Sequence, residues 1–109
     1  MRVLFDQGTP LPLRESLGEH DISTAYERSW STLKNSDLLD AAEREGFEVL
    51  LTTDQNLRHQ QNIRAWSIAI VVLRTTSWPR IQRDIPAVVR AINSAVPGSY
   101  VEVSFPTVG

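Results

Sequence analysis

Three apolar runs constrain the fold of this chain more than any other feature of its sequence. They lie within residues 2–5, 47–52 and 68–73, and each contains three or more consecutive apolar side chains. A strand with continuous rather than alternating apolar residues is covered on both faces, which is typical of a parallel sheet. We therefore predict that these three segments are buried, parallel strands.

Two helices are predicted between the first and the second of these apolar runs. Residues 10–17 can form a short helix, and residues 37–45 form a second helix that Ser36 or Asp37 caps at its start and Gly46 ends. Both helices carry apolar side chains for packing against the sheet. The expected core contacts are Leu11, Leu13, Leu17, Leu38, Leu39, Ala41 and Ala42.

A longer helix is predicted after the third apolar run. Residues 77–79 begin it, with a proline tolerated in the first turn, and residues 97–98 break it. Branched aliphatic residues recur at spacings of four, three and four, which places them on one helix face. Arg83 and Arg90 point roughly to the opposite face. The aliphatic residues are Ile81, Ile85, Val88 and Ile92.

Two further strands complete the expected pattern, at residues 20–25 and 100–103. Strands and helices then alternate along the whole chain, which predicts a three-layer α/β domain with a mostly parallel sheet of about five strands and helices on both faces. The length of 109 residues and the hydrophobic content of 41% suit one domain over residues 1–109. Residues 104–109 are expected to be a tail.

Composition limits the possible chemistry and location. The chain has no cysteine, which excludes disulfides, thiol nucleophiles and cysteine-bound metals and fits a reducing cytoplasm. The apolar run at the N-terminus is too short for a signal-peptide core, and no apolar run approaches the ~20 residues of a membrane span. We therefore expect a cytoplasmic protein with no membrane association. The net charge of −2 gives no overall attraction to nucleic acid.

Three aspartates are the main candidates for chemistry. Asp6 and Asp54 directly follow apolar strands, and Asp37 begins a helix. In a parallel sheet these positions fall at one edge, where gathered carboxylates repel one another unless a cation is bound. Mg²⁺ or Mn²⁺ held by carboxylates can activate water for attack on a phosphodiester. The alternative interpretation is structural, with Asp37 as a helix cap and Asp6 and Asp54 in Asx-turns.

At these residues the chain resembles small bacterial PIN-like proteins related to toxin ribonucleases. Those proteins open with an apolar strand running into Asp-Glu-Asn-Leu-Pro, continue with a helix that begins with Asp, and later have a strand ending in Thr-x-Asp-x-Asp-Phe. The corresponding segments here are residues 4–10, 36–42 and 51–57, and residues 20–25 resemble the Gly-His-Asp-Val stretch of the family. The resemblance covers residues 1–73.

The resemblance implies a PIN-like fold and a Mg²⁺- or Mn²⁺-dependent endoribonuclease, with RNA as substrate. Such proteins often serve as the toxin of a toxin–antitoxin pair, so an antitoxin protein is an expected partner. Asp6, Asp37 and Asp54 would hold the metal or orient its bound water, and they are the candidate catalytic residues. The candidate substrate-binding residues are Thr53 or Thr52, Asn56 and Arg58.

The chain departs from the family pattern at the first and third motifs. Gln7 and Gly8 replace Glu and Asn, while Asn56 and Leu57 replace the second acid and the Phe. The site therefore loses up to two negative charges, although Glu27 could supply a carboxylate. The alternative function is a catalytically depleted PIN-like domain that binds RNA or protein.

A flavodoxin-like receiver domain is a third interpretation, because acids at strand ends also bind Mg²⁺ in such domains. The Ser or Thr and the Lys expected at the ends of the later strands are not found, and Arg74 follows the strongest strand instead.

Overall fold

The computed structural model describes residues 1–55, 57 and 66–105. Five parallel strands form one sheet in the order β2-β1-β3-β4-β5, which confirms the predicted α/β class and parallel sheet. The strands are β1 (Arg2–Phe5), β2 (Asp21–Thr24), β3 (Val49–Thr52), β4 (Ala69–Leu73) and β5 (Tyr100–Val103).

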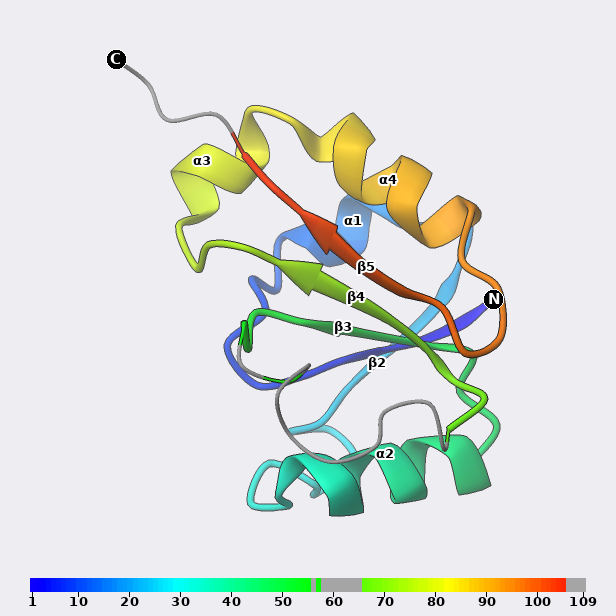
Figure 1. Cartoon of the computed structure of the whole chain (residues 1–109). Coiled ribbons are helices and arrows are strands. Elements are labelled where there is room, and N and C mark those ends of the chain that lie inside the picture. The colour runs from blue at the N-terminus through cyan, green and yellow to red at the C-terminus, as the bar shows by residue number, and fades with distance from the viewer. Residues whose placement is uncertain (56, 58–65, 106–109) are drawn as a thin grey trace.

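Helices cover both faces of the sheet (Figure 1). α2 packs on one face, whereas α1, α3 and α4 lie on the other. No helix in the described part of the chain is long and apolar enough to cross a membrane. The helices are α1 (Leu13–Ser16), α2 (Asn35–Arg44), α3 (Trp78–Gln82) and α4 (Ile85–Asn93).

The continuous apolar strands separate two hydrophobic cores. In β1, Val3 and Phe5 face the core shared with α1, α3 and α4, and Leu4 faces the core shared with α2. Every residue of β3 and β4 is buried. Alternate side chains of a strand point to opposite faces, so a sheet covered twice requires apolar residues at every position.

The strand order reverses between β1 and β3. β1 pairs with β2 on one side and with β3 on the other, so that Phe5 lies level with Thr24 and with Leu51. The chain passes from β1 outward to β2, returns across β1 to β3, and then continues outward to β4 and β5. This 2-1-3-4-5 order is one of the common doubly wound arrangements, in which ligands bind beyond the carboxyl ends of the strands at the reversal.

The helix predicted between Ser77 and Pro97 is in fact two helices. α3 begins after Ser77, as expected, but it ends at Gln82, and α4 starts at Ile85 with Pro86 in its first turn. Proline lacks an amide N–H and clashes with the carbonyl four residues earlier, which disfavours one continuous helix through Pro86 and favours a new helix with Pro86 in its first turn.

Three further details differ from the sequence predictions. Leu11 precedes α1 and is 59% exposed, so its predicted place in the core is wrong. α2 begins earlier than expected, with Lys34 at its N-cap and no side-chain cap, so that Asp37 lies in the first turn, where an acid favours the helix dipole. Phe105, in the segment predicted to be a tail, is buried against the sheet; residues 106–109 lie outside the described residues.

Candidate functional site at the carboxyl ends of β1 and β3

Asp6 and Asp54 follow the two strands between which the sheet order reverses. Asp6 comes directly after β1, and its backbone N–H donates to the carbonyl oxygen of Leu51 at 2.9 Å. This bond continues the β1–β3 pairing by one residue and fixes Asp6 against the end of β3. Asp54 lies two residues beyond that end. Neighbouring strands therefore bring the first and third sequence motifs together.

A buried hydroxyl group links the two aspartate segments. The Thr52 hydroxyl donates to Oδ2 of Asp6 at 2.8 Å and accepts a hydrogen bond from the backbone N–H of Asp54 at 3.1 Å. Thr52 has no exposed surface. A fully buried hydroxyl needs partners, and here both belong to the candidate site. Thr52 therefore positions the Asp6 carboxylate relative to the loop that carries Asp54.

The electrostatic environment of Asp6 disfavours its charge. Burial raises the pKa of the Asp6 carboxyl above its ordinary value of 3.8, and the negative charge of Asp54 adds to that increase. Hydrogen bonds from Thr52 and from the Gln7 backbone, the latter 2.8 Å long, oppose the rise in pKa. A bound cation would reverse this local preference by favouring the ionised carboxylate.

Asp37 lies exposed in the first turn of α2. That helix begins on the side of the molecule toward which the strand arrows point (Figure 1). Within residues 1–55, 57 and 66–105, no three or more His, Cys, Asp or Glu side chains are grouped so that they could hold a metal ion. The structure thus brings Asp6 near Asp54 without a ready cluster of three carboxylates, and a metal-binding role for Asp37 stays a prediction.

The residues present are compatible with Mg²⁺ or Mn²⁺. Mg²⁺ in enzymes is commonly held by one or two carboxylates together with water and substrate phosphates. Asp6 and Asp54 match this modest requirement, and burial of Asp6, with a further contribution from the charge of Asp54, raises the pKa of Asp6. A divalent cation between such groups would offset both the repulsion and the partial loss of solvent around Asp6.

The predicted substrate-binding residues are only partly described. Thr53 is half-buried beside the loop after β1, and its Oγ1 would lie 3.2 Å from a Cβ atom placed on Gly8. Asn56 and Arg58 lie outside the described residues. Gln55, which precedes them, donates through Nε2 to the carbonyl oxygen of Arg74 at 3.1 Å. The third motif is therefore anchored at Gln55 to the end of β4.

A cavity of about 460 Å³ opens beside Asp6, on the side of β1 that faces β2. It is bounded by the loops that follow these two strands and by the N-terminal part of α1. The lining residues are Phe5, Asp6, Gln7, Gly8, Thr9, Leu11, Arg14, Thr24, Ala25, Tyr26 and Glu27.

Glu27, considered above as a replacement carboxylate, lines this cavity but is ion-paired. Its two carboxylate oxygens accept hydrogen bonds from Arg14 at 2.9 and 3.0 Å, and one also accepts from the backbone N–H of Thr24 at 3.0 Å. The bonds from Arg14, and then the one from the Thr24 backbone, lower the pKa of Glu27. The Glu27 carboxylate therefore lines the cavity as one half of an ion pair with the Arg14 guanidinium.

Sequence reasoning did not identify Arg14 and Tyr26 as residues of the site. Arg14 lies in the four-residue helix α1, and Tyr26 lies in the turn after β2. Neither segment has a periodic pattern or a motif of known chemistry. The available signal was indirect, because both segments follow strands that were predicted to be parallel and so had to meet at the Asp6 edge.

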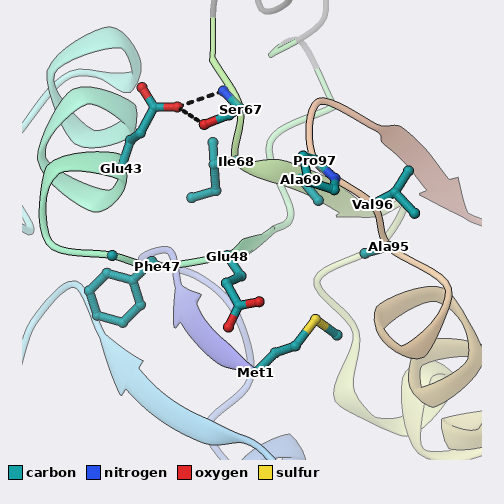
Figure 2. Close-up of a pocket in the computed structure, with 11 residues that line it drawn as sticks. Met1, Glu43, Phe47, Glu48, Ser67, Ile68, Ala69, Ala95, Val96 and Pro97 are labelled. Carbon is teal, nitrogen blue, oxygen red and sulfur yellow. Dashed lines mark hydrogen bonds between the residues drawn. The ribbon is translucent and has the colours of Figure 1, made fainter.

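A second cavity, of about 300 Å³, lies at the opposite end of the sheet (Figure 2). Met1, Glu48 and Val96 line it, and Glu43 accepts hydrogen bonds from the backbone and hydroxyl of Ser67 at its edge. None of the residues predicted for the functional site lies here. This cavity therefore provides control positions far along the strands from Asp6.

Comparisons with known proteins do not place the chain in a family. No protein-family model, no curated protein and no solved structure matches it.

Proposed function

We propose that the protein is a Mg²⁺- or Mn²⁺-dependent endoribonuclease of the PIN-like class, acting at the carboxyl edge of β1 and β3. The observation that carries this proposal is the Asp6–Thr52–Asp54 arrangement, with Asp6 partly desolvated at the point where the strand order reverses. The resemblance of residues 1–73 to toxin ribonucleases supports RNA as the substrate and an antitoxin protein as partner. The cysteine-free chain suits activity in a reducing cytoplasm.

Each residue of the pair has a defined task in this proposal. Asp6 and Asp54 hold the cation, and Thr52 keeps one oxygen of Asp6 occupied, so that the carboxylate has a fixed orientation. The bound ion would supply an activated water molecule and charge stabilisation at the scissile phosphate. In this proposal the Thr53 hydroxyl, which lies beside the loop after β1, donates to a phosphate oxygen of the substrate.

An RNA cleavage assay tests the proposal. We expect the wild-type protein to cleave a labelled single-stranded RNA in Mg²⁺ or Mn²⁺ and to lose this activity in EDTA. Asp6→Asn and Asp54→Asn should each lower the rate by about 100-fold or more, because each removes a ligand of the cation that stabilises the developing charge, and loss of such stabilisation typically costs this much.

Asp21→Asn is the matched control for these variants. Asp21 begins β2 at the amino end of the sheet and is exposed, and its carboxylate forms a 3.7 Å ion pair with Arg2. This variant should retain the wild-type rate. Equal rates for wild type and Asp6→Asn would contradict the proposal and assign any cleavage to a contaminant or to another site.

The same assay decides the part played by Asp37. The resemblance makes Asp37 a third ligand, whereas its exposed position in the first turn of α2 also suits a purely helix-stabilising acid. A loss comparable to that of Asp54→Asn would assign Asp37 to the active site. An unchanged rate in Asp37→Asn would leave a site of two carboxylates.

The second candidate function is a depleted PIN-like domain that binds RNA without cleaving it. Gln7 and Asn56 stand where the related proteins carry acids, and Tyr26 is 82% exposed at the cavity beside Asp6. Metal-independent RNA binding, with no cleavage that depends on Asp6, would favour this function over the nuclease.

A further inference from the structure

We infer that the cavity beside Asp6 is a nucleobase-binding subsite and that Tyr26 is its stacking platform. This inference rests on the proposed function and deepens it, because it names the residues that would hold one nucleotide of a single-stranded substrate next to Asp6. The volume of about 460 Å³ lies within the range of small-molecule sites, which is about 300–1,000 Å³.

Exposed apolar side chains mark this cavity. Tyr26 is 82% exposed and Leu11 is 59% exposed, and both line the cavity that also contains Asp6. Large apolar groups left in water lose the free energy that burial would provide, about 25 cal/mol for each Å². A ligand with an apolar face that covered the Tyr26 ring and the Leu11 side chain would gain that free energy on binding.

The turn that carries Tyr26 is already fixed. The Thr24 hydroxyl accepts a hydrogen bond from the Glu27 backbone N–H at 3.0 Å, and Glu27 Oε1 accepts one from the Thr24 backbone N–H at 3.0 Å. The Tyr26 carbonyl oxygen also accepts a bond from the N–H of Ser29. These reciprocal bonds close the turn around Tyr26, so a ligand would not have to order the backbone on binding.

The charged side chains that line the cavity determine where the base and the phosphate of a nucleotide can lie. The cavity is lined by the carboxylates of Asp6 and Glu27 and by the guanidinium of Arg14, which is bonded to Glu27. A phosphate group would meet excess negative charge there unless a divalent cation accompanied it at Asp6. The uncharged base therefore suits the Tyr26 and Leu11 side, while the phosphate lies toward Asp6.

The size of the apolar surface favours a base over a protein segment. A stable protein interface buries about 800 Å² on each partner around a packed apolar centre. This cavity offers one ring and one leucine as exposed large apolar groups. A single base stacked on an aromatic side chain needs no more, and each such contact contributes about 1–3 kcal/mol of binding free energy.

A binding cycle with base-free RNA tests the subsite. Fluorescence anisotropy would measure the affinity of the 109-residue chain for a labelled ten-nucleotide oligouridylate and for an abasic ribose-phosphate chain of equal length, both with Ca²⁺. Gel analysis after each titration would verify that the probe is intact. Tyr26→Ala should weaken binding of the oligouridylate by about fivefold to 100-fold and leave binding of the abasic chain unchanged.

Three further variants define the contact. Tyr26→Phe keeps the ring and should bind like wild type, whereas Tyr26→Leu keeps apolar area without a π-face and should weaken binding nearly as much as Tyr26→Ala. Val96→Ala, a substitution of an apolar residue that is 59% exposed at the opposite cavity, should have no effect.

The outcomes separate the subsite from the nuclease. Equal oligouridylate affinities for wild type and Tyr26→Ala, or equal losses for both probes, would overturn the subsite whatever the cleavage assay shows. Base-dependent binding through Tyr26 without cleavage that depends on Asp6 would support the subsite and overturn only the proposed hydrolysis.

Discussion

At the scale of single residues, the site combines an aspartate that resists ionisation with a threonine that orients it. The folded protein holds the proton of Asp6 more tightly than the unfolded chain, because burial and Asp54 raise its pKa. Sites that bind cations commonly keep such unfavourable charges because function requires them. In the absence of metal, Asp6 therefore costs the fold some stability at neutral pH.

Replacement of Asp6 should reveal this cost. The cost arises when Asp6 is ionised. It is absent below the ordinary pKa of 3.8, where Asp6 is protonated in both the folded and the unfolded chain, and it develops as the pH rises through the raised pKa. Asp6→Asn should therefore be more stable than wild type at about pH 7, with an advantage that shrinks as the pH falls toward 3.8. Urea unfolding followed by circular dichroism in EDTA checks this pH dependence. An advantage that grew on acidification would contradict the account.

Thr52 should matter for stability as well as for orientation. Thr52→Val keeps the shape but removes the donor to Asp6 Oδ2 and the acceptor of the Asp54 N–H. Leaving these groups unsatisfied should cost about 1–3 kcal/mol of unfolding free energy. Thr76→Val, at an exposed position, is the control and should change it by less than about 0.5 kcal/mol. Equal stabilities of the two variants in urea unfolding would show that the Thr52 hydroxyl does not link the two segments.

At the scale of elements, the loop after β1 depends on Gly8. This residue has φ +95°, a conformation that side chains disfavour, and a Cβ atom there would lie 3.2 Å from Thr53 Oγ1. Glycine adopts such a positive φ at little cost because it has no Cβ. Gly8 therefore allows the backbone shape that brings the β1 loop against the end of β3.

Two glycine substitutions test the role of this loop. Gly8→Ala should lower the free energy of unfolding by about 1–2 kcal/mol, because it places a side chain in the left-handed region. Gly18→Ala is the matched control: Gly18 has no positive φ, and its nearest contact would be an ordinary 3.7 Å, so this change should be neutral or slightly stabilising. Urea unfolding measures both, and a Gly8→Ala protein as stable as Gly18→Ala would refute the proposed strain.

At the scale of the whole molecule, the sequence predicted the sheet because continuous apolar runs leave few alternatives. Covered strands joined by helices dictate parallel pairing, so the common edge of Asp6 and Asp54 could be predicted from local patterns. The break between α3 and α4 could also have been predicted, because a proline such as Pro86 in a helix interior kinks or breaks the helix.

The wall of the cavity beside Asp6 could not be predicted in the same way. Tyr26 and Arg14 reach it from a turn and a one-turn helix, and their positions depend on individual hydrogen bonds, from Arg14 to the Ile22 carbonyl oxygen and from the Thr24 N–H to Glu27. The pairing of Glu27 with Arg14 was hidden for the same reason. Local periodicity carries no information about such contacts, which the tertiary structure alone defines.

Mn²⁺ titration tests most directly whether Asp6 and Asp54 form one metal site. Isothermal titration calorimetry should give one Mn²⁺ for each wild-type molecule, with affinity that falls as the pH is lowered through the raised pKa of Asp6. Asp6→Asn and Asp54→Asn should each lower the affinity at least about tenfold, whereas Asp21→Asn should not. Unchanged Mn²⁺ affinity in Asp6→Asn and Asp54→Asn would contradict the account.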